Sequence, residues 1–222
     1  MSINLVMLDE KDIIAVDARI SIRTSRANTA RYGHMAIHPY PPELETTWQL
    51  PDGTDVSVRP IRPEDAEIEQ DFVKNLSAES KYFRFMQSMD QLTPMMLARF
   101  TQIDYDREMG LILTEPGRPG QTEIFGVANL IADPDNRSAE YAIVVRHDMV
   151  GLGLGIVLMR RIIDYARNRG IKEMFGDVLQ ENRPMLKLCK VLGFSQSRVP
   201  DDPGVTRDLD VPDDLESGDD LP

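Results

Sequence analysis

One segment of the chain decides its fold: Val144-Val-Arg-His-Asp-Met-Val-Gly151-Leu-Gly153-Leu-Gly155-Ile-Val-Leu-Met159. A β-branched strand runs into a loop with glycine at 151, 153 and 155, and a long helix begins at once. Glycine lets the backbone turn tightly and brings several N–H groups to one point, while a helix N-terminus adds unsatisfied donors and partial positive charge. This combination suits a pyrophosphate group. The alternative is a glycine-rich β–α turn without a ligand.

Two better-known phosphate loops do not fit this segment. A P-loop needs Gly-x4-Gly-Lys-Ser/Thr, and Ile156-Val157 stand where the Lys and the Ser/Thr would be. A dinucleotide-binding turn needs Gly-x-Gly-x-x-Gly after the first strand of a βαβ repeat, whereas the spacing here is Gly-x-Gly-x-Gly.

Hydrophobic periodicity predicts alternating strands and helices outward from this segment. A small hairpin is expected at residues 3–8 and 13–22, followed by a linker at 23–47 and a turn at Asp52-Gly53. Strands are predicted at 56–58, 111–113, 124–131, 140–145 and 175–179, and helices at 63–76, 77–86, 94–102, 155–168 and 183–192.

Charge is concentrated at one end of the chain. The formal net charge is −12, and residues 201–222 contain nine acids and one base, a net of −8. The segment has few large apolar residues, so an acidic, solvated and disordered tail is expected there. Nucleic acid is not an expected partner, because neutralising phosphates requires clustered Lys and Arg.

Composition also bears on the compartment. With Cys189 as the single cysteine, the chain has neither an internal disulfide framework nor a cysteine-clustered zinc site, and no metal site is expected. The longest uncharged apolar stretch, Met149 to Met159, has 11 residues, fewer than the roughly 18 needed to span a bilayer. The first ten residues lack the basic region of a signal peptide. A cytoplasmic protein that does not enter the membrane is therefore expected.

The sequence resembles the GNAT N-acetyltransferase superfamily. That family has Arg/Gln-x-x-Gly-x-Gly/Ala between a strand and a helix, and residues 150–155 match it with Val150 in the Arg/Gln position. Asn182 to Phe194 resembles the second acyl-CoA segment, and Val58 to Asp65 resembles the first strand and helix entry. The resemblance implies an α/β (α+β) GNAT fold, a mixed, mostly antiparallel sheet of six or seven strands with helices on both faces.

A closer resemblance is to the GNAT domain of bacterial Pat-type protein lysine acetyltransferases. It rests on four segments, Trp48 to Thr54, Arg59 to Asp65, Leu76 to Phe85 and Ala139 to Arg146. Residues 1–22 look like the last hairpin of an ATP-grasp domain. The resemblance divides the chain into an ATP-grasp-like remnant and linker at 1–50, a GNAT domain at 51–200 and the tail at 201–222, in a natural short form or a fragment.

The resemblance also implies a binding site for acetyl-CoA. Backbone amides of the glycine loop would hold its pyrophosphate, and the strand before the loop would splay from the next so that pantetheine fills the gap. Asn182 would approach the pantetheine or phosphate arm. The residues assigned to this site are Ile143, Val145, Val150, Gly151, Leu152, Gly153, Leu154, Gly155 and Asn182.

Two residues are candidates for the chemistry. Glu140 lies ten residues before Val150, at an interval similar to that of the family's general base, and Tyr141, Ala142 and Ile143 are expected to desolvate it. Without the family, a strand-edge acid facing solvent would be the preferred interpretation. Cys189 occupies the position of a proton-donating Tyr and could act as an acid or accept the acyl group, or be a buried small residue, which the pattern favours.

The expected function is acetyl-CoA-dependent transfer to protein lysines, for example those of acyl-CoA synthetases. Two alternatives remain open. One is acetylation of a small amine, which would use the same fold and donor site. The other is a catalytically idle acyl-CoA sensor or interaction module.

Overall fold

The computed structural model describes residues 2–8, 13–19, 38–50, 53–199 and 202–209. The chain divides into two units, residues 1–36 and residues 37–222. In the first unit, β1 (Ser2–Leu8) pairs antiparallel with β2 (Ile13–Arg19), which confirms the predicted hairpin. Its resemblance to the end of an ATP-grasp domain stays a prediction.

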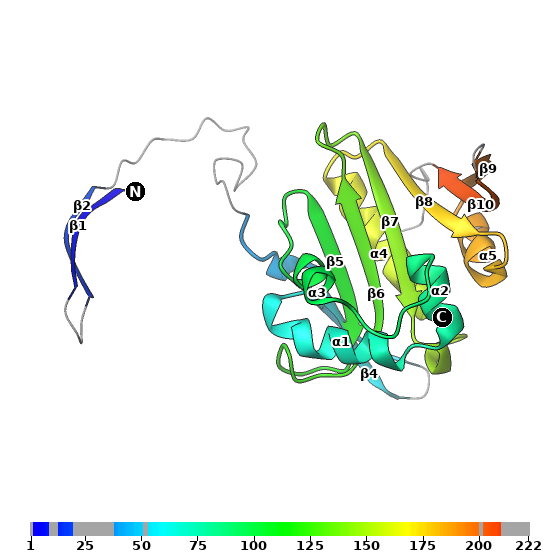
Figure 1. The fold of residues 1–222 in the computed structure, drawn as a ribbon, viewed down its shortest axis with the longest axis horizontal. Coiled ribbons are helices and arrows are strands. Elements are labelled where there is room, and N and C mark those ends of the chain that lie inside the picture. The colour runs from blue at the N-terminus through cyan, green and yellow to red at the C-terminus, as the bar shows by residue number, and fades with distance from the viewer. Residues whose placement is uncertain (1, 9–12, 20–37, 51–52, 200–201, 210–222) are drawn as a thin grey trace. The chain divides into compact units, whose positions relative to one another are not determined.

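The second unit is built on one eight-stranded sheet in the order β3-β4-β5-β6-β7-β8-β10-β9. Every neighbouring pair is antiparallel except β7 and β8, which run parallel. The mixed, mostly antiparallel sheet is confirmed (Figure 1), but it has eight strands where six or seven were expected, because β10 adds to the sheet beside β8. Its strands are β3 (Thr46–Gln49), β4 (Asp55–Pro60), β5 (Glu108–Thr114), β6 (Ile124–Ala132), β7 (Ser138–Val145), β8 (Glu173–Leu179), β9 (Ser195–Val199) and β10 (Asp202–Leu209).

Three strands lie outside the predicted strand ranges. Strand β3 begins at the end of the segment interpreted as linker and precedes the predicted turn, β9 follows the last predicted helix, and β10 lies in the segment expected to be a disordered tail. Residues 205–209 of β10 pair with β8 on one side, and β9 pairs with β10 on the other. Backbone hydrogen bonds to both neighbouring strands thus stabilise β10, although its segment has few of the large apolar residues that usually keep a chain folded. The expectation was wrong for 202–209, and residues 210–222 lie outside the described residues.

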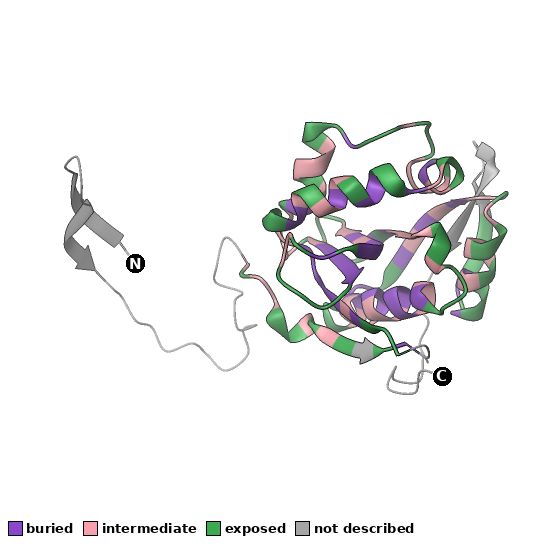
Figure 2. Cartoon of the chain, turned by 90° about the horizontal axis from the view of Figure 1, so that it is seen from below, coloured by how far each residue is buried: buried purple, intermediate pink, exposed green. Residues whose placement is uncertain are grey.

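Helices cover both faces of the sheet (Figure 2). Helix α4 (Leu154–Asn168) buries Leu158 and Ile162 in the larger apolar cluster, which also contains Cys189 of α5 (Arg183–Val191). Helices α1 (Ala66–Asn75), α2 (Ala78–Phe85) and α3 (Pro94–Thr101) contribute to the second cluster. Short 3₁₀ helices occur at η1 (Pro42–Leu44), η2 (Pro63–Asp65) and η3 (His147–Met149).

Strand β5 shows why both faces must be covered. Leu111 and Leu113 are buried in one cluster and Ile112 in the other, as expected when successive side chains point to opposite faces. A strand buried on both sides reads as a continuous apolar run in the sequence.

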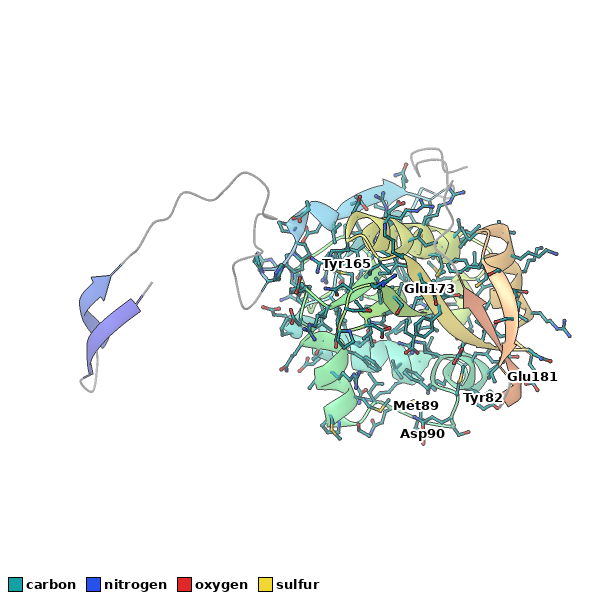
Figure 3. The ribbon with its side chains drawn as sticks, turned by 90° about the horizontal axis from the view of Figure 1, so that it is seen from above. Tyr82, Met89, Asp90, Tyr165, Glu173 and Glu181 are labelled. Atoms are coloured by element: carbon teal, nitrogen blue, oxygen red, sulfur yellow. The ribbon has the colours of Figure 1, made fainter. Side chains whose placement is uncertain are left out.

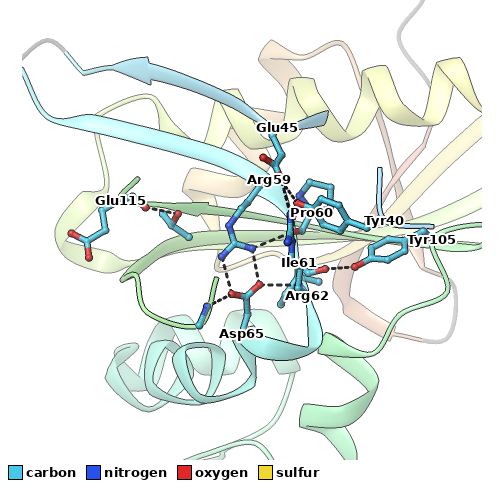
Figure 4. Close-up of polar contacts among 11 residues, drawn as sticks. Tyr40, Glu45, Arg59, Pro60, Ile61, Arg62, Asp65, Tyr105 and Glu115 are labelled. Carbon is cyan, nitrogen blue, oxygen red and sulfur yellow. Dashed lines mark hydrogen bonds and ion pairs between the residues drawn. The ribbon is translucent and has the colours of Figure 1, made fainter. Parts of the chain in front are cut away.

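A buried ion pair fixes the entry to α1 (Figure 4). Arg59 of β4 donates two hydrogen bonds of 2.7 Å to the carboxylate of Asp65, which also accepts from the amides of Arg62 and Gly120. Burial alone would raise the pKa of Asp65, but the bonds from Arg59 hold it below its ordinary value. The pair ties β4, η2 and the β5–β6 loop together.

In the described part of the chain, no helix combines the length and apolar character needed to cross a membrane.

Candidate active site

The sheet opens between β7 and β8. These strands pair only at Ser138–Glu140 against Glu173–Phe175, and beyond this point β8 continues along β10. A cavity of about 250 Å³ lies in the opening. Its lining comes from β7, β8, α2 and the start of α5, namely Phe83, Arg84, Phe85, Met86, Glu140, Tyr141, Ala142, Ile143, Gly176, Asp177, Val178, Asn182 and Met185. We call this cavity the donor cleft.

The glycine loop leads from the end of β7 into α4. Gly151 and Gly153 have φ angles of 96° and 79°, in the left-handed region that favours glycine, and α4 begins directly after Gly153. Among the described residues, no backbone acceptor takes a hydrogen bond from the amides of 151–155. The loop therefore presents a set of free donors at the N-terminus of a 15-residue helix, as an anion site requires.

The side chains of this loop contribute little polarity. Val150 and Leu152 are 65% and 42% exposed, so apolar groups face solvent on either side of Gly151. Leu154 is buried beneath the helix start, and a side chain at Gly155 would contact Leu188 of α5.

The other predicted donor-site residues are divided between the cleft and the core. Ile143 lines the donor cleft, but Val145 is not among the lining residues and packs near Gly126. Asn182 lines the cleft and caps α5, where its side-chain oxygen accepts a hydrogen bond of 3.2 Å from the Met185 amide. Its side-chain nitrogen keeps two donors that no described residue uses.

Glu140 lies at the point where β7 and β8 part. Its side chain is exposed, so the expected desolvation by its neighbours was wrong. The physical reason is strand alternation, because Tyr141 points to the opposite face and joins the larger core cluster. Glu140 also belongs to a cross-strand row, opposite Ile131 of β6, which in turn lies opposite Glu108 of β5.

A second cavity, of about 90 Å³, lies on this face beside the donor cleft. Glu140, Tyr141, Ala142 and Arg84 line both cavities. We call the second cavity the acceptor pocket, after the acceptor that the family resemblance predicts, because it shares Glu140 with the donor cleft. Its other lining residues are Arg99, Phe100, Ile103, Glu108, Met109, Asn129, Leu130 and Ile131.

Sequence reasoning missed Arg84 and Glu69. Arg84 donates a hydrogen bond of 2.8 Å to the side-chain oxygen of Asn129, and burial lowers its pKa although the charges of Glu69 and Glu140 oppose the shift. Glu69 of α1 is 4% exposed, and burial raises its pKa to about 7 while the charge of Arg84 lowers it. The only sequence signal for Glu69 was a charged residue at a position of α1 where the hydrophobic pattern places a core residue.

Cys189 is fully buried in α5, and it does not line the donor cleft. Its Sγ lies 3.3 Å from the hydroxyl oxygen of Tyr141, which is a hydrogen-bond distance for sulfur. The Tyr141 ring packs 5.3 Å from the ring of Phe194. These contacts are those of a packed core residue.

Comparison with known proteins identifies the family of the chain. The model of the acetyltransferase (GNAT) family matches residues 71–194. An acetyltransferase of Pseudomonas aeruginosa is 36% identical over 153 residues, which cover 69% of this chain and 82% of that protein.

Solved structures show the same fold. The GNAT domain of S. lividans PAT is 31% identical with a TM-score of 0.70, and the match covers 77% of this chain and 98% of that domain. A cAMP-binding acyltransferase from Mycobacterium smegmatis is 26% identical with a TM-score of 0.52, and the match covers 77% of this chain and 48% of that one. The chain thus belongs to the GNAT acetyltransferase family.

Proposed function

We propose that this acetyltransferase transfers the acetyl group of acetyl-CoA to lysine side chains of proteins, such as acyl-CoA synthetases, with Glu140 as general base. The observation that carries the proposal is the position of Glu140, which lines both the donor cleft and the acceptor pocket. Similarity to the GNAT domain of S. lividans PAT supports a protein acceptor over a small amine.

The donor would bind along the opening between β7 and β8. The free backbone amides of residues 151–155 are suited to binding the pyrophosphate of acetyl-CoA. The side-chain N–H groups of Asn182 that no described residue uses are suited to hydrogen bonding with the pantetheine arm. Phe83, Ile143 and Val178 provide an apolar lining for the acyl end. Val150 supplies no polar contact, so the backbone would hold the phosphates without the side chain that relatives place there.

The reaction requires a neutral amine. A lysine has a reference pKa near 10.4, so roughly one in a few thousand is neutral at pH 7. Glu140 would take the proton directly or through water, which its exposed carboxylate allows. The nitrogen then bonds to the thioester carbon, the carbon–sulfur bond breaks, and the departing thiolate is protonated by water. Backbone N–H groups near Ile143 would polarise the carbonyl.

Cys189 contributes packing in this scheme. Its thiol is buried away from the cleft lining, and a thiolate leaving group needs little help from an acid. A ping-pong route would leave an acetyl group on Cys189 and raise the intact mass of the protein. Because direct transfer forms no such intermediate, we expect the mass to stay unchanged when the protein is incubated with acetyl-CoA alone.

The test is release of free CoA when the chain is offered acetyl-CoA and a lysine-containing acyl-CoA synthetase, with spermidine and an aminoglycoside as competing acceptors. Release that leaves acetyl-lysine on the synthetase supports the proposal. Release with small amines alone replaces it with the small-molecule alternative, and tight binding without release on every acceptor favours the sensor.

Glu140→Gln tests the base directly. The variant is expected to bind acetyl-CoA normally and to lose at least 100-fold in kcat at pH 7. Glu173→Gln is the matched control, because Glu173 is also an exposed strand carboxylate but lines neither cavity (Figure 3). Undiminished turnover of Glu140→Gln between pH 6 and 9 would show that another group takes the proton.

A further inference from the structure

The acceptor pocket is lined by four charged side chains that do not pair with one another. Two are guanidinium groups, Arg84 of α2 and Arg99 of α3. Two are carboxylates, Glu108 of β5 and Glu140 of β7. Within the described residues, no ion pair of 4.0 Å or less includes any of the four. Charges of both signs thus surround one small cavity and stay available to a guest.

Arg84 directs most of its hydrogen-bonding capacity to the two cavities. A guanidinium carries five N–H groups, and Arg84 uses one of them, from Nη2, in its bond of 2.8 Å to the Asn129 side chain. No described residue accepts from the other four. Its Nε and Nη1 lack a partner but are not buried, so their N–H groups reach the cavities that Arg84 lines.

The position of this guanidinium is fixed from three elements. Asn129 of β6 holds it by the hydrogen bond, and the ring centroids of Phe85 of α2 and Phe100 of α3 lie 5.1 and 5.6 Å from its central carbon. Both ring distances are within the range of cation–π attraction. Since arginine stays protonated in proteins, Arg84 is a permanent cation with free donors in a fixed orientation, which is the arrangement that binds a carboxylate by two parallel hydrogen bonds.

Arg99 provides a second cation in the same pocket. It lies in the last turn of α3, next to Phe100, whose ring contacts Arg84. Its side chain is exposed and makes no hydrogen bond or ion pair with any described residue. Two unpaired guanidinium groups in the lining of one cavity favour an anionic group in the guest. The two carboxylates of the lining favour a cationic group in the same guest, because one charge of each sign leaves the pocket neutral.

We propose that the acceptor pocket selects lysines with a carboxylate beside them: Arg84 and Arg99 bind the side chain of a neighbouring Asp or Glu, while Glu140 faces the amine. The inference rests on the proposed function, because it names the class of acceptor for the same site. It makes Arg84 and Arg99 residues that determine specificity, since each would touch the acceptor directly.

The test compares pairs of acceptor peptides that differ in one charge. Each peptide has blocked termini, a single lysine, and either Glu or Gln at one position within two residues of the lysine. The kcat/KM of the full chain with acetyl-CoA is measured for each pair at low salt. The wild type is expected to prefer the Glu peptide about tenfold at one or more positions, which corresponds to about 1.4 kcal/mol. The preference should shrink in about 0.5 M NaCl, because salt screens exposed charges.

Variants assign the preference to the two cations. Arg99→Gln is expected to reduce the Glu-to-Gln ratio to about 3, and Arg99→Glu to about 1 or below, because the new carboxylate repels the peptide. Arg84→Lys keeps the charge but loses the planar fork, so the ratio should fall about threefold. A ratio taken within one variant cancels any general loss of activity. Arg118→Gln is the matched control, because it removes an exposed guanidinium that lines neither cavity and should leave the ratio unchanged.

The outcomes separate this inference from the proposed function. If no lysine of any peptide or protein is acetylated, the proposed function is wrong and the inference falls with it. If lysines are acetylated but the wild-type ratio is near 1 at every position, the anion-binding role alone is overturned. A tenfold ratio that survives in both Arg99→Glu and Arg84→Lys also overturns it. Faster acetylation of free lysine, with its own α-carboxylate, than of every Glu peptide would assign the two cations to a small zwitterion and overturn the protein acceptor.

Discussion

The buried carboxylate of Glu69 is expected to make the protein less stable as the pH rises. Its pKa is about 7 in the folded protein, raised by burial from 4.5. Between these values the folded chain holds a proton that the unfolded chain has already released, so stability falls with rising pH. A difference of about 2.5 pH units at about 1.4 kcal/mol each gives a loss of about 3.5 kcal/mol, complete above pH 7.

Glu69→Gln removes this titration while keeping the side-chain shape. Urea unfolding of both proteins, followed by circular dichroism, is measured from roughly pH 5.5 to 8.5, because the sequence pI is about 4.7 and solubility is low near it. The stability loss of the wild type runs up to about pH 7, so about 1.5 pH units of it fall above pH 5.5. Between pH 5.5 and 8.5 the free energy of unfolding of the variant should therefore rise by about 2 kcal/mol relative to that of the wild type.

Glu67→Gln is the control, because Glu67 is an exposed residue of the same helix turn. It should follow the wild type within about 0.5 kcal/mol at every pH. If the curves for Glu69→Gln and the wild type run parallel, Glu69 does not carry a raised pKa in the folded protein.

Three further changes have defined outcomes. Gly176→Ala places a methyl group 2.7–3.0 Å from three ring carbons of Tyr141, so unfolding measurements should show a loss of about 1–3 kcal/mol; no loss would mean the ring moves freely. Replacing Arg59 with Met leaves the buried Asp65 carboxylate without its ion-pair partner and should lower the free energy of unfolding by about 3–5 kcal/mol. Replacing Asp65 with Leu as well should recover much of this loss. Val150→Arg should tighten acetyl-CoA binding about 3–10-fold in calorimetry at low salt, and unchanged affinity would place the phosphates away from residues 150–155.

Most of the fold could be predicted because its signals are local. The strand before Val150, the positive φ angles of Gly151 and Gly153 and the helix after them all follow from neighbouring residues. Strand β10 could not be predicted in this way. Its stability comes from ladders with β8 and β9, and the composition of residues 201–222 carries no trace of that pairing.

The sequence predicted the backbone elements that form the candidate site, but not the surroundings of its charged side chains. The family resemblance suggested Glu140 as the base, but the exposure of its side chain depends on which face of β7 it occupies. Arg84 and Asn129 are 45 residues apart and meet only because α2 packs over the sheet. The contact of Tyr141 with Cys189, across 48 residues, is equally invisible to local pattern.

The parting of β7 from β8 has a consequence for the protein before any donor arrives. Residues 142–145 of β7 have no strand partner on the β8 side among the described residues, so part of a strand edge is left open in the interior of the sheet. Such an edge can pair with any extended chain that offers amides, including a second copy of the protein. The two amides of pantetheine can satisfy it as an added strand does. Acyl-CoA bound along this edge is therefore expected to block such pairing, and aggregation on storage should slow when CoA is present.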